Sequence, residues 1–170
     1  MNRDTFVQLF DYCRWANHRV WECVMALSDE QFYQPLDYSV GPIQRQVFHT
    51  MQVEYWWPHF LRTGELDFYP YTPETDRETI RALWDKVEAE NAAYAARLDD
   101  AELARMVRPD ADWEDPTWTA ISVTQALLQV LFHSMDHRSQ TLAMLHKLGG
   151  PTVEQDFLYY LQDPMVKRAK

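Results

Sequence analysis

Two histidines four residues apart, His133 and His137, lie in a long run of helical periodicity. On an α-helix this spacing puts both side chains on one face, about 6 Å apart along the axis, so both imidazoles can bind the same metal ion. Other residues on that face are suited to a protein interior: Val130, Thr141, Met144 and Leu148. Because histidine also occurs as a hydrogen-bonded core residue, the pair alone leaves metal binding and a structural role open.

A third histidine, His49, lies in an earlier helical run and shares an inward face with Gln46, Val53, Trp56 and Phe60. Three neutral imidazoles with no fourth protein ligand would leave coordination positions for water or substrate, as in catalytic sites and unlike closed structural zinc sites. Imidazole suits zinc, nickel, copper and iron, so these ligands do not choose the metal. The remaining histidines lie off these faces or far along them, and we expect them not to bind it: His18, His59 and His146.

Long amphipathic helices must position these side chains. Helices are expected at roughly residues 4–27, 42–63 and 122–148, with a further one running from the capping box Thr75–Glu78 to Leu98. Similar capping boxes occur at Ser28–Gln31, where a short extra turn can begin, and at Ser122–Gln125. Gly64 ends the expected helix at 42–63 and Gly149 ends the one at 122–148. Pro58 lies inside the first of these two and predicts a kink or a loosened last turn there.

The composition favours one helical domain. Apolar residues make up 46% of the chain and glycine only four positions, which suits long helices better than turn-rich β-structure. We predict an all-α fold, a four-helix bundle with long crossover loops and a short C-terminal helix near residues 154–161. Residues 99–119 are expected to form an acidic, proline-containing crossover that can include a short hairpin. No linker or repeat divides residues 1–170, which we expect to form a single domain.

Charge and hydropathy exclude several classes of partner. The formal charge of −10 would repel a phosphate backbone, so we expect no binding to nucleic acid. No apolar stretch approaches the roughly 20 residues that span a bilayer, and the first residues lack a signal-peptide pattern, so we expect a cytoplasmic protein without membrane contact. Cys13 and Cys23 are about 15 Å apart along one expected helix, too far for a disulfide.

Three motifs carry a family resemblance: Tyr12–Asn17, Val47–His49 and, most specifically, His133–Gln140 followed by Leu142, Leu145 and Gly149. Together they resemble the DinB-like superfamily of small metal-binding helical bundles, which includes YfiT-like proteins and thiol-dependent transferases and isomerases. The likeness covers nearly the whole chain. Ser139 stands where the family often has glycine, a change that a helix interior favours because glycine costs about 0.5–1 kcal/mol there.

This resemblance implies that His49, His133 and His137 bind one divalent ion, usually zinc or nickel, in a bundle that commonly forms a homodimer. Gln46, Gln140 and Asn17 are close to these ligands or face inward, so they can orient an imidazole or a water, or serve as ordinary polar bundle residues. Arg138 points about 100° around the helix from His137. It can contact an anionic substrate at the rim or pair with an acidic residue, and we favour the ion pair.

Two functions of different classes follow, together with a simpler reading. In the first, the protein is a metal-dependent hydrolase or thiol-S-transferase acting on a small molecule, in which the ion activates a water or a low-molecular-weight thiol. In the second, it is a non-catalytic, stress-associated bundle that binds a metal or another ligand, and the ion mainly ties two helices together. The simplest reading is a metal-free helical domain, which metal analysis tests directly.

Overall fold

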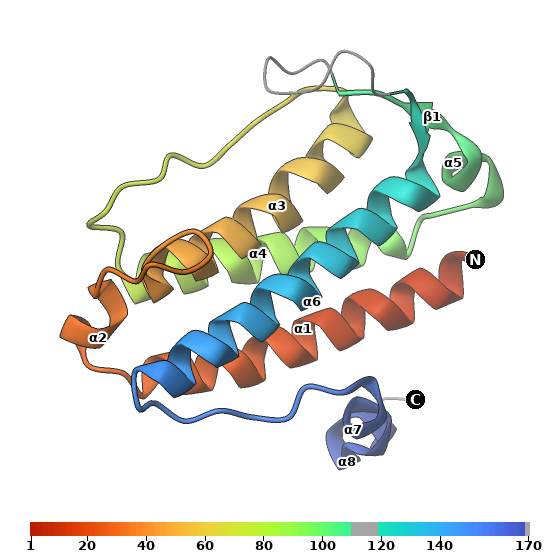
Figure 1. The fold of residues 1–170 in the computed structure, drawn as a ribbon. Coiled ribbons are helices and arrows are strands. Elements are labelled where there is room, and N and C mark those ends of the chain that lie inside the picture. The colour runs from red at the N-terminus through yellow and green to blue at the C-terminus, as the bar shows by residue number, and fades with distance from the viewer. Residues whose placement is uncertain (110–118, 169–170) are drawn as a thin grey trace.

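The computed structural model describes residues 1–109 and 119–168 (Figure 1). Residues 110–118 of the predicted acidic crossover and residues 169–170 lie outside the described residues. The elements are α1 Arg3–Met25, α2 Asp29–Tyr33, α3 Ile43–Thr63, α4 Arg77–Ala95, α5 Asp100–Ala104, β1 Met106–Val107, β2 Ile121–Ser122, α6 Val123–Lys147, α7 Phe157–Gln162 and α8 Pro164–Arg168.

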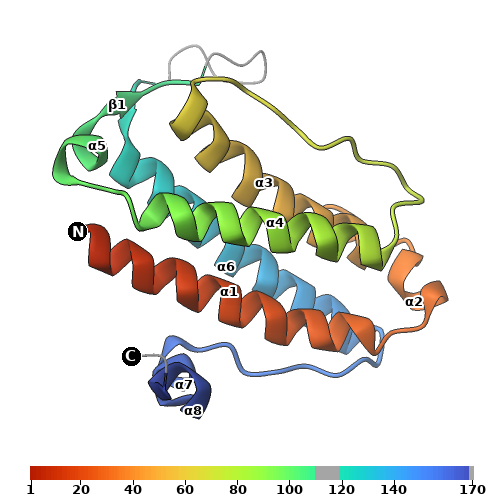
Figure 2. The same cartoon turned by 180° about the vertical axis from the view of Figure 1, so that it is seen from behind.

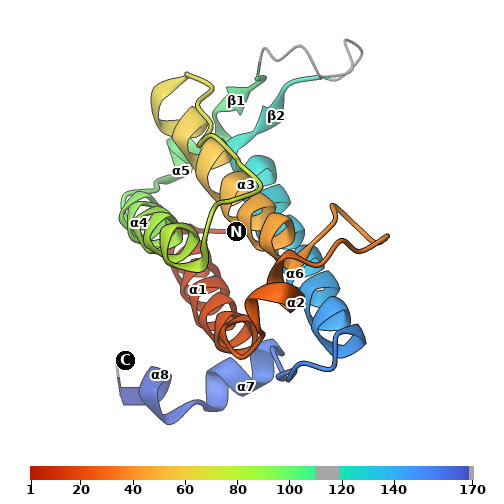
Figure 3. The ribbon, with the colours of Figure 1, turned by 90° about the vertical axis from the view of Figure 1, so that its left-hand side faces the viewer.

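The long helices α1, α3, α4 and α6 form the predicted all-α bundle. Seen along the bundle, α3 packs against α4 and α6, and α1 packs against the same two helices from the other side (Figure 3). Helices α3 and α4 run in one direction, and α1 and α6 run in the other (Figures 1 and 2). The connection between α3 and α4, residues 64–76, therefore runs the length of the bundle (Figure 1).

Local signals place most helix ends within two residues of their predicted positions. The capping boxes at Ser28 and Ser122 are both formed, and Gly64 ends α3 in the left-handed conformation with φ of 78°. The start of α4 differs, because Asp76 rather than Thr75 caps it by accepting a hydrogen bond from the backbone N–H of Thr79. Helices α5 and α8 were not predicted, since five residues are too few to show helical periodicity.

The crossover between α4 and α6 contains the short hairpin that the sequence allowed. Strands β1 and β2 pair antiparallel, with Met106 opposite Ser122 and Val107 opposite Ile121. The C-terminal segment then returns along α1, where the Tyr12 hydroxyl donates to the backbone oxygen of Gln155 at 2.8 Å. Among the described residues, no helix is long and apolar enough to cross a membrane.

Both cysteines are free thiols within the bundle, as their spacing on one helix predicted. Cys13 and Cys23 lie on α1 and are buried. The largest part of the core is apolar and comes from all four long helices, including the buried side chains of Phe6, Ile43, Met51, Ile80, Leu127 and Leu145. The aromatic residues Tyr55 and Trp56 belong to this core, so they pack the interior of the bundle.

Pro58 lies inside α3, which continues through it from Ile43 to Thr63. Proline has no backbone N–H, so the carbonyl of Glu54, one turn earlier, loses its helical hydrogen-bond donor. The side-chain amide of Asn91 on α4 replaces that donor, because its Nδ2 lies 2.8 Å from the Glu54 carbonyl oxygen. A neighbouring helix thus satisfies the group that the proline leaves unpaired, and the exchange joins α3 to α4.

We predict that Asn91→Ala lowers the free energy of unfolding by about 1–3 kcal/mol, because it leaves the buried Glu54 carbonyl without a donor. In a Pro58→Ala background the new backbone N–H can bond that carbonyl, so the same substitution should cost clearly less. Urea denaturation of the four proteins in this double-mutant cycle measures the difference. Equal costs in the two backgrounds would show that Asn91 does not compensate for Pro58.

Candidate metal centre

The three histidines predicted as ligands meet between α3 and α6, which pack against each other. His49 extends from α3, and His133 and His137 extend from successive turns of α6. Each ring offers one nitrogen that lies within 4.8 Å of those of the other two. Nε2 of His49 is 3.1 Å from Nε2 of His133, and the three ring centroids are 4.1 to 5.0 Å apart. One metal ion can be held between them.

The surroundings of the rings favour neutral imidazole, the form that binds metal. Burial and then the neighbouring His137 and Arg45 lower the pKa of His49 to about 4. Burial, followed by the charges that His137 and His49 would carry, lowers the pKa of His133 to about 3. Burial also lowers the pKa of His137, although Asp136 opposes the shift. At neutral pH all three rings therefore offer lone pairs instead of competing protons.

Two glutamines proposed from the sequence lie directly beside the triad. Nε2 of Gln46 donates a hydrogen bond to Nδ1 of His137 at 2.8 Å and lies 3.3 Å from the backbone oxygen of the same residue. It also contacts Oε1 of Gln140 at 3.1 Å. Gln140 in turn donates to Oδ2 of Asp136 at 2.9 Å and accepts from the Ser39 hydroxyl. A chain of polar contacts thus reaches from the loop before α3 to one ring of the triad.

Ser39 is the member of this chain that the sequence did not reveal. It lies in the connection between α2 and α3, and its φ of 52° falls in the left-handed region that residues other than glycine rarely adopt. Gly41, two residues later, has a φ of 114°. In the sequence, this glycine is the only residue near Ser39 whose type indicates an unusual backbone conformation. No periodicity marks a loop residue, so only the fold could bring Ser39 to Gln140.

Two buried polar atoms at the triad lack a hydrogen-bond partner among the described residues, Nδ1 of His133 and Oε1 of Gln46. Half a turn of the Gln46 amide would give up the bonds of its Nε2 to Gln140 and to the His137 backbone oxygen, and would offer Oε1 to an N–H at Nδ1 of His137. That tautomer leaves Nε2 of His137 free to bind a metal. Three neutral imidazoles and an acceptor that can fix this tautomer suit a divalent ion such as zinc or nickel. The residues present therefore fit a metal ion.

Similarity to known proteins covers nearly the whole chain. The DinB family model matches residues 1–165. The chain belongs to the DinB family. Comparison with curated proteins gives no match. Family membership agrees with the helical bundle and with a histidine cluster that can hold a metal, and it leaves the metal and any reaction open.

Asn17 and Arg138 of this DinB-family chain bond to other residues than the triad: Asn17 is a polar residue of the bundle interior, which was one of its two possible roles, and Arg138 has neither of the roles expected for it. Asn17 contacts no imidazole; its Nδ2 donates to both carboxylate oxygens of Glu54, at 3.1 and 3.2 Å. Arg138 is buried and is not at a rim. Its guanidinium bonds to Sγ of Cys13 and Oδ1 of Asn17, both at 3.0 Å, and to Oε1 of Gln155 at 2.9 Å. Because α6 turns Arg138 toward α1, no acidic side chain among the described residues forms an ion pair with it.

Glu54 is the buried residue whose importance sequence reasoning missed. Besides Asn17, its carboxylate accepts from Nε1 of Trp84 at 2.7 Å and from Oγ of Ser134 at 2.6 Å. The thiol of Cys13 lies 3.5 Å from the same carboxylate. Burial, followed by the charge of Glu88, raises the pKa of Glu54, and the hydrogen bonds act in the opposite direction. The only available signal was that its partners Asn17 and Ser134 belong to the motifs Tyr12–Asn17 and His133–Gln140.

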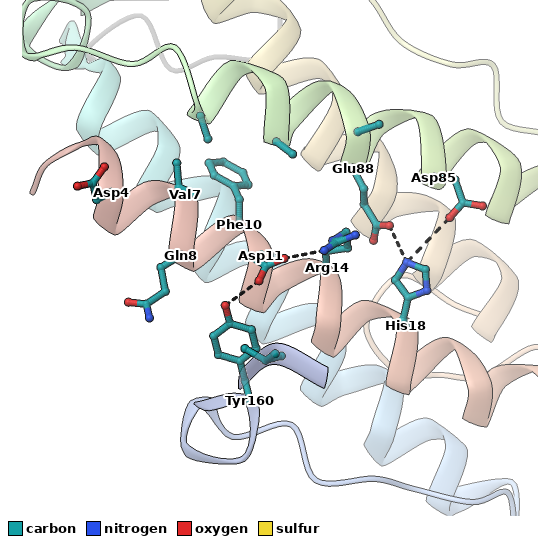
Figure 4. A pocket seen from close by; sticks show the side chains of 14 residues that line it. Asp4, Val7, Gln8, Phe10, Asp11, Arg14, His18, Asp85, Glu88 and Tyr160 are labelled. Carbon is teal, nitrogen blue, oxygen red and sulfur yellow. Dashed lines mark hydrogen bonds and ion pairs between the residues drawn. The ribbon is translucent and has the colours of Figure 1, made fainter. Parts of the chain in front are cut away.

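A second group of possible ligands, His18, Asp85 and Glu88, lies beside a groove of about 850 Å³ between α1 and α4 (Figure 4). Nε2 of His18 is 3.0 Å from Oε2 of Glu88 and 4.0 Å from Oδ1 of Asp85. The guanidinium of Arg81 already occupies both oxygens, at 3.0 Å from Asp85 and 2.9 Å from Glu88. A metal ion would have to displace this cation, so we interpret the group as an ion-pair network.

We predict that Gln46→Met weakens zinc or nickel binding about 10- to 100-fold, because the ring of His137 loses the side chain that orients it. Gln44→Met is the matched control, since Gln44 is equally buried on α3 but bonds to Thr72, Thr75 and Tyr71. Both variants should lose stability, and only the first should lose metal affinity. Titration of each purified variant with a chromophoric metal competitor distinguishes them, and equal affinities would exclude the role given to Gln46.

We also predict that the thiol of Cys13 is inert in the folded protein. Burial, then the charge of Glu54, raises its pKa to about 12, so about one molecule in ten thousand would carry the thiolate at pH 8. In a Cys23→Ser variant, a disulfide reagent that reports released thiolate should react fully in guanidinium chloride and hardly at all under native conditions. Rapid native labelling would place Cys13 in contact with solvent.

Proposed function

We propose that this DinB-family protein is a metal-dependent enzyme that uses zinc or nickel at His49, His133 and His137 to act on a small molecule. The observation that carries the proposal is the open ligand set. Among residues 1–109 and 119–168, the cluster holds three imidazoles and no fourth side-chain ligand. His49 and His133 are only partly buried, so a small molecule can approach the rings from solvent. Closed structural sites have four protein ligands.

The protein's own contribution is to keep three lone pairs converged and neutral. The divalent ion, when bound, would act as a Lewis acid and lower the pKa of a water or thiol that serves as nucleophile. Gln46 orients His137, and Gln140 links Gln46 to Asp136 and to the loop before α3. These contacts hold the ring of His137 in place, and a half turn of the Gln46 amide selects its metal-binding tautomer.

Hydrolysis and thiol transfer both fit this site, and the chain's own thiols bear on the choice. Cys13 bonds to Arg138 and Glu54 within the bundle, and burial raises the pKa of Cys23 as well. Neither cysteine belongs to the group of side chains that could hold the metal ion, His49, His133 and His137. A thiol-S-transferase reaction would therefore take its sulfur from a low-molecular-weight thiol in solution.

No carboxylate among the described residues is hydrogen-bonded to a ring of the triad. Glu54 is held by Asn17, Trp84 and Ser134, and Asp136 is bonded to Gln140. The proposed chemistry therefore uses no carboxylate as general base. It depends on a water or thiol whose pKa the metal ion would lower. A substrate with a reactive electrophilic centre suits such a site.

The alternative is a non-catalytic role, in which the ion joins α3 to α6 and stabilises the bundle. The position of the triad between these two helices favours it, because an ion bound only by the folded state raises stability by mass action. Homodimer formation and a cytoplasmic location, which the family resemblance and the sequence suggested, stay predictions.

We predict that His137→Ala removes stoichiometric metal and lowers turnover by more than about 100-fold. Loss of a residue that only hydrogen-bonds to a metal ligand typically costs up to about 100-fold, so loss of a ligand should cost more. His146→Ala is the matched control, because His146 is exposed near the end of the same helix. The measurements are metal analysis of protein purified without an affinity tag, and a screen of electrophiles and esters with and without added thiol.

The outcomes separate the hypotheses. Metal-dependent turnover that disappears in His137→Ala and survives in His146→Ala supports the enzyme. Stoichiometric metal with no turnover, together with a thermal midpoint that falls when the metal is removed, supports the non-catalytic role. Protein that binds neither added zinc nor added nickel would refute both.

A further inference from the structure

A small cavity lies on the other side of α6 from the triad, between α1, α6 and the start of α7. Its volume is about 230 Å³. Most of its wall is apolar and includes Leu9, Leu128, Phe132, Met135 and Phe157. Phe132 and Met135 are 59% and 46% exposed, so they form the edge of the cavity toward solvent.

The polar residues that line this cavity include Arg138, Cys13 and Asp156. The Arg138 side chain is only 2% exposed, and its guanidinium lies 5.7 Å from the ring of Tyr12, another wall residue. Nε of Arg138 donates to Gln155, and Nη1 donates to Cys13 and Asn17. Among the described residues Nη2 of Arg138 forms no hydrogen bond, and Arg138 is one of the residues that line the cavity.

The buried positive charge of Arg138 also lacks a directly bonded anion. Each of its three hydrogen-bond partners is a neutral group: an amide oxygen of Gln155, an amide oxygen of Asn17 and the thiol of Cys13, whose pKa burial raises to about 12. Glu54 approaches Arg138 only through Asn17 and Cys13. Buried charges in proteins are generally paired with an opposite charge, and Glu54 compensates the charge of Arg138 only from a distance, so the guanidinium can still bind an anion directly.

The shape and chemistry of the cavity restrict which anion fits. A guanidinium nitrogen beside apolar walls suits a monocarboxylate with a short hydrocarbon body. The guanidinium would bind the carboxylate, and the hydrocarbon would displace water from the apolar wall. The volume is below the roughly 300–1,000 Å³ of sites for drug-sized ligands, so the body must be short. The exposed carboxylate of Asp156 at the cavity would repel a phosphate dianion more than a monoanion.

We propose that this cavity binds a small aliphatic or aromatic monocarboxylate through Nη2 of Arg138, at a site separate from the metal triad. The site is independent of the proposed catalysis, because its wall contains none of the three histidines.

Calorimetric titration of the full chain with hexanoate, and with hexanamide as its neutral analogue, tests the proposal. Hexanoate should bind at one site per chain and at least about tenfold more tightly than hexanamide, because a charge-assisted hydrogen bond is lost in the amide. The matched variants Phe132→Gln and Phe132→Glu differ only in charge at an exposed position. The glutamate variant should bind hexanoate at least about tenfold more weakly than the glutamine variant.

Location is tested separately from affinity. Hexanoate affinity should change less than about twofold in His49→Ala, and crystals soaked with 6-bromohexanoate should show bromine between α1 and α6. The proposal would be overturned if hexanoate showed no saturable binding up to roughly 20 mM, because a weaker dissociation constant would not indicate a specific site. It would also be overturned by equal affinity for the amide, or by binding lost in His49→Ala, which would place the carboxylate at the metal. Loss of metal-dependent turnover in the enzyme assays would leave these readouts unchanged.

Discussion

The buried carboxylate of Glu54 is the constraint on which the arrangement of the four long helices depends. It extends from α3 and accepts hydrogen bonds from Asn17 on α1, Trp84 on α4 and Ser134 on α6. A carboxylate removed from water is costly unless its oxygens are bonded, so the bundle must keep all of these donors in place. An apolar core tolerates small shifts between helices, whereas a set of directed hydrogen bonds does not.

This constraint also aligns the metal centre. Ser134 directly follows His133 on α6, and Glu54 lies five residues after His49 on α3. The hydrogen bond of 2.6 Å between Ser134 and Glu54 therefore fixes how α3 and α6 are placed along each other, close to the level at which the rings meet. The backbone of Glu54 carries a further link, because its carbonyl receives the amide of Asn91 in place of the N–H that Pro58 lacks. One residue thus connects helix register, a proline in mid-helix and the triad.

Helix α6 separates two different polar environments. One face carries His133 and His137 toward α3, where low pKa values keep the rings neutral. The next residue, Arg138, points toward α1 and keeps a full positive charge in the interior, held by Cys13, Asn17 and Gln155. Neutral nitrogen lone pairs on one side favour a cation, and an unpaired guanidinium on the other favours an anion. The same short sequence segment therefore offers two binding chemistries because successive residues of a helix point in different directions.

The sequence by itself determined the four long helices and pointed to the three histidines that lie together between two of them. Apolar periodicity, the capping boxes at Ser28 and Ser122 and the glycine at position 64 are local signals, and a helix end depends mainly on such signals. The spacing of His133 and His137 on one face is likewise a property of a single helix. Only the tertiary structure decided that Arg138 is buried without an acidic partner, that Asn17 serves Glu54 instead of an imidazole, and that Ser39 reaches Gln140. The contacts of Asn17 with Glu54 and of Ser39 with Gln140 join residues more than 30 positions apart. Their distances, and the surroundings of Arg138, depend on how the helices pack, which no local pattern specifies.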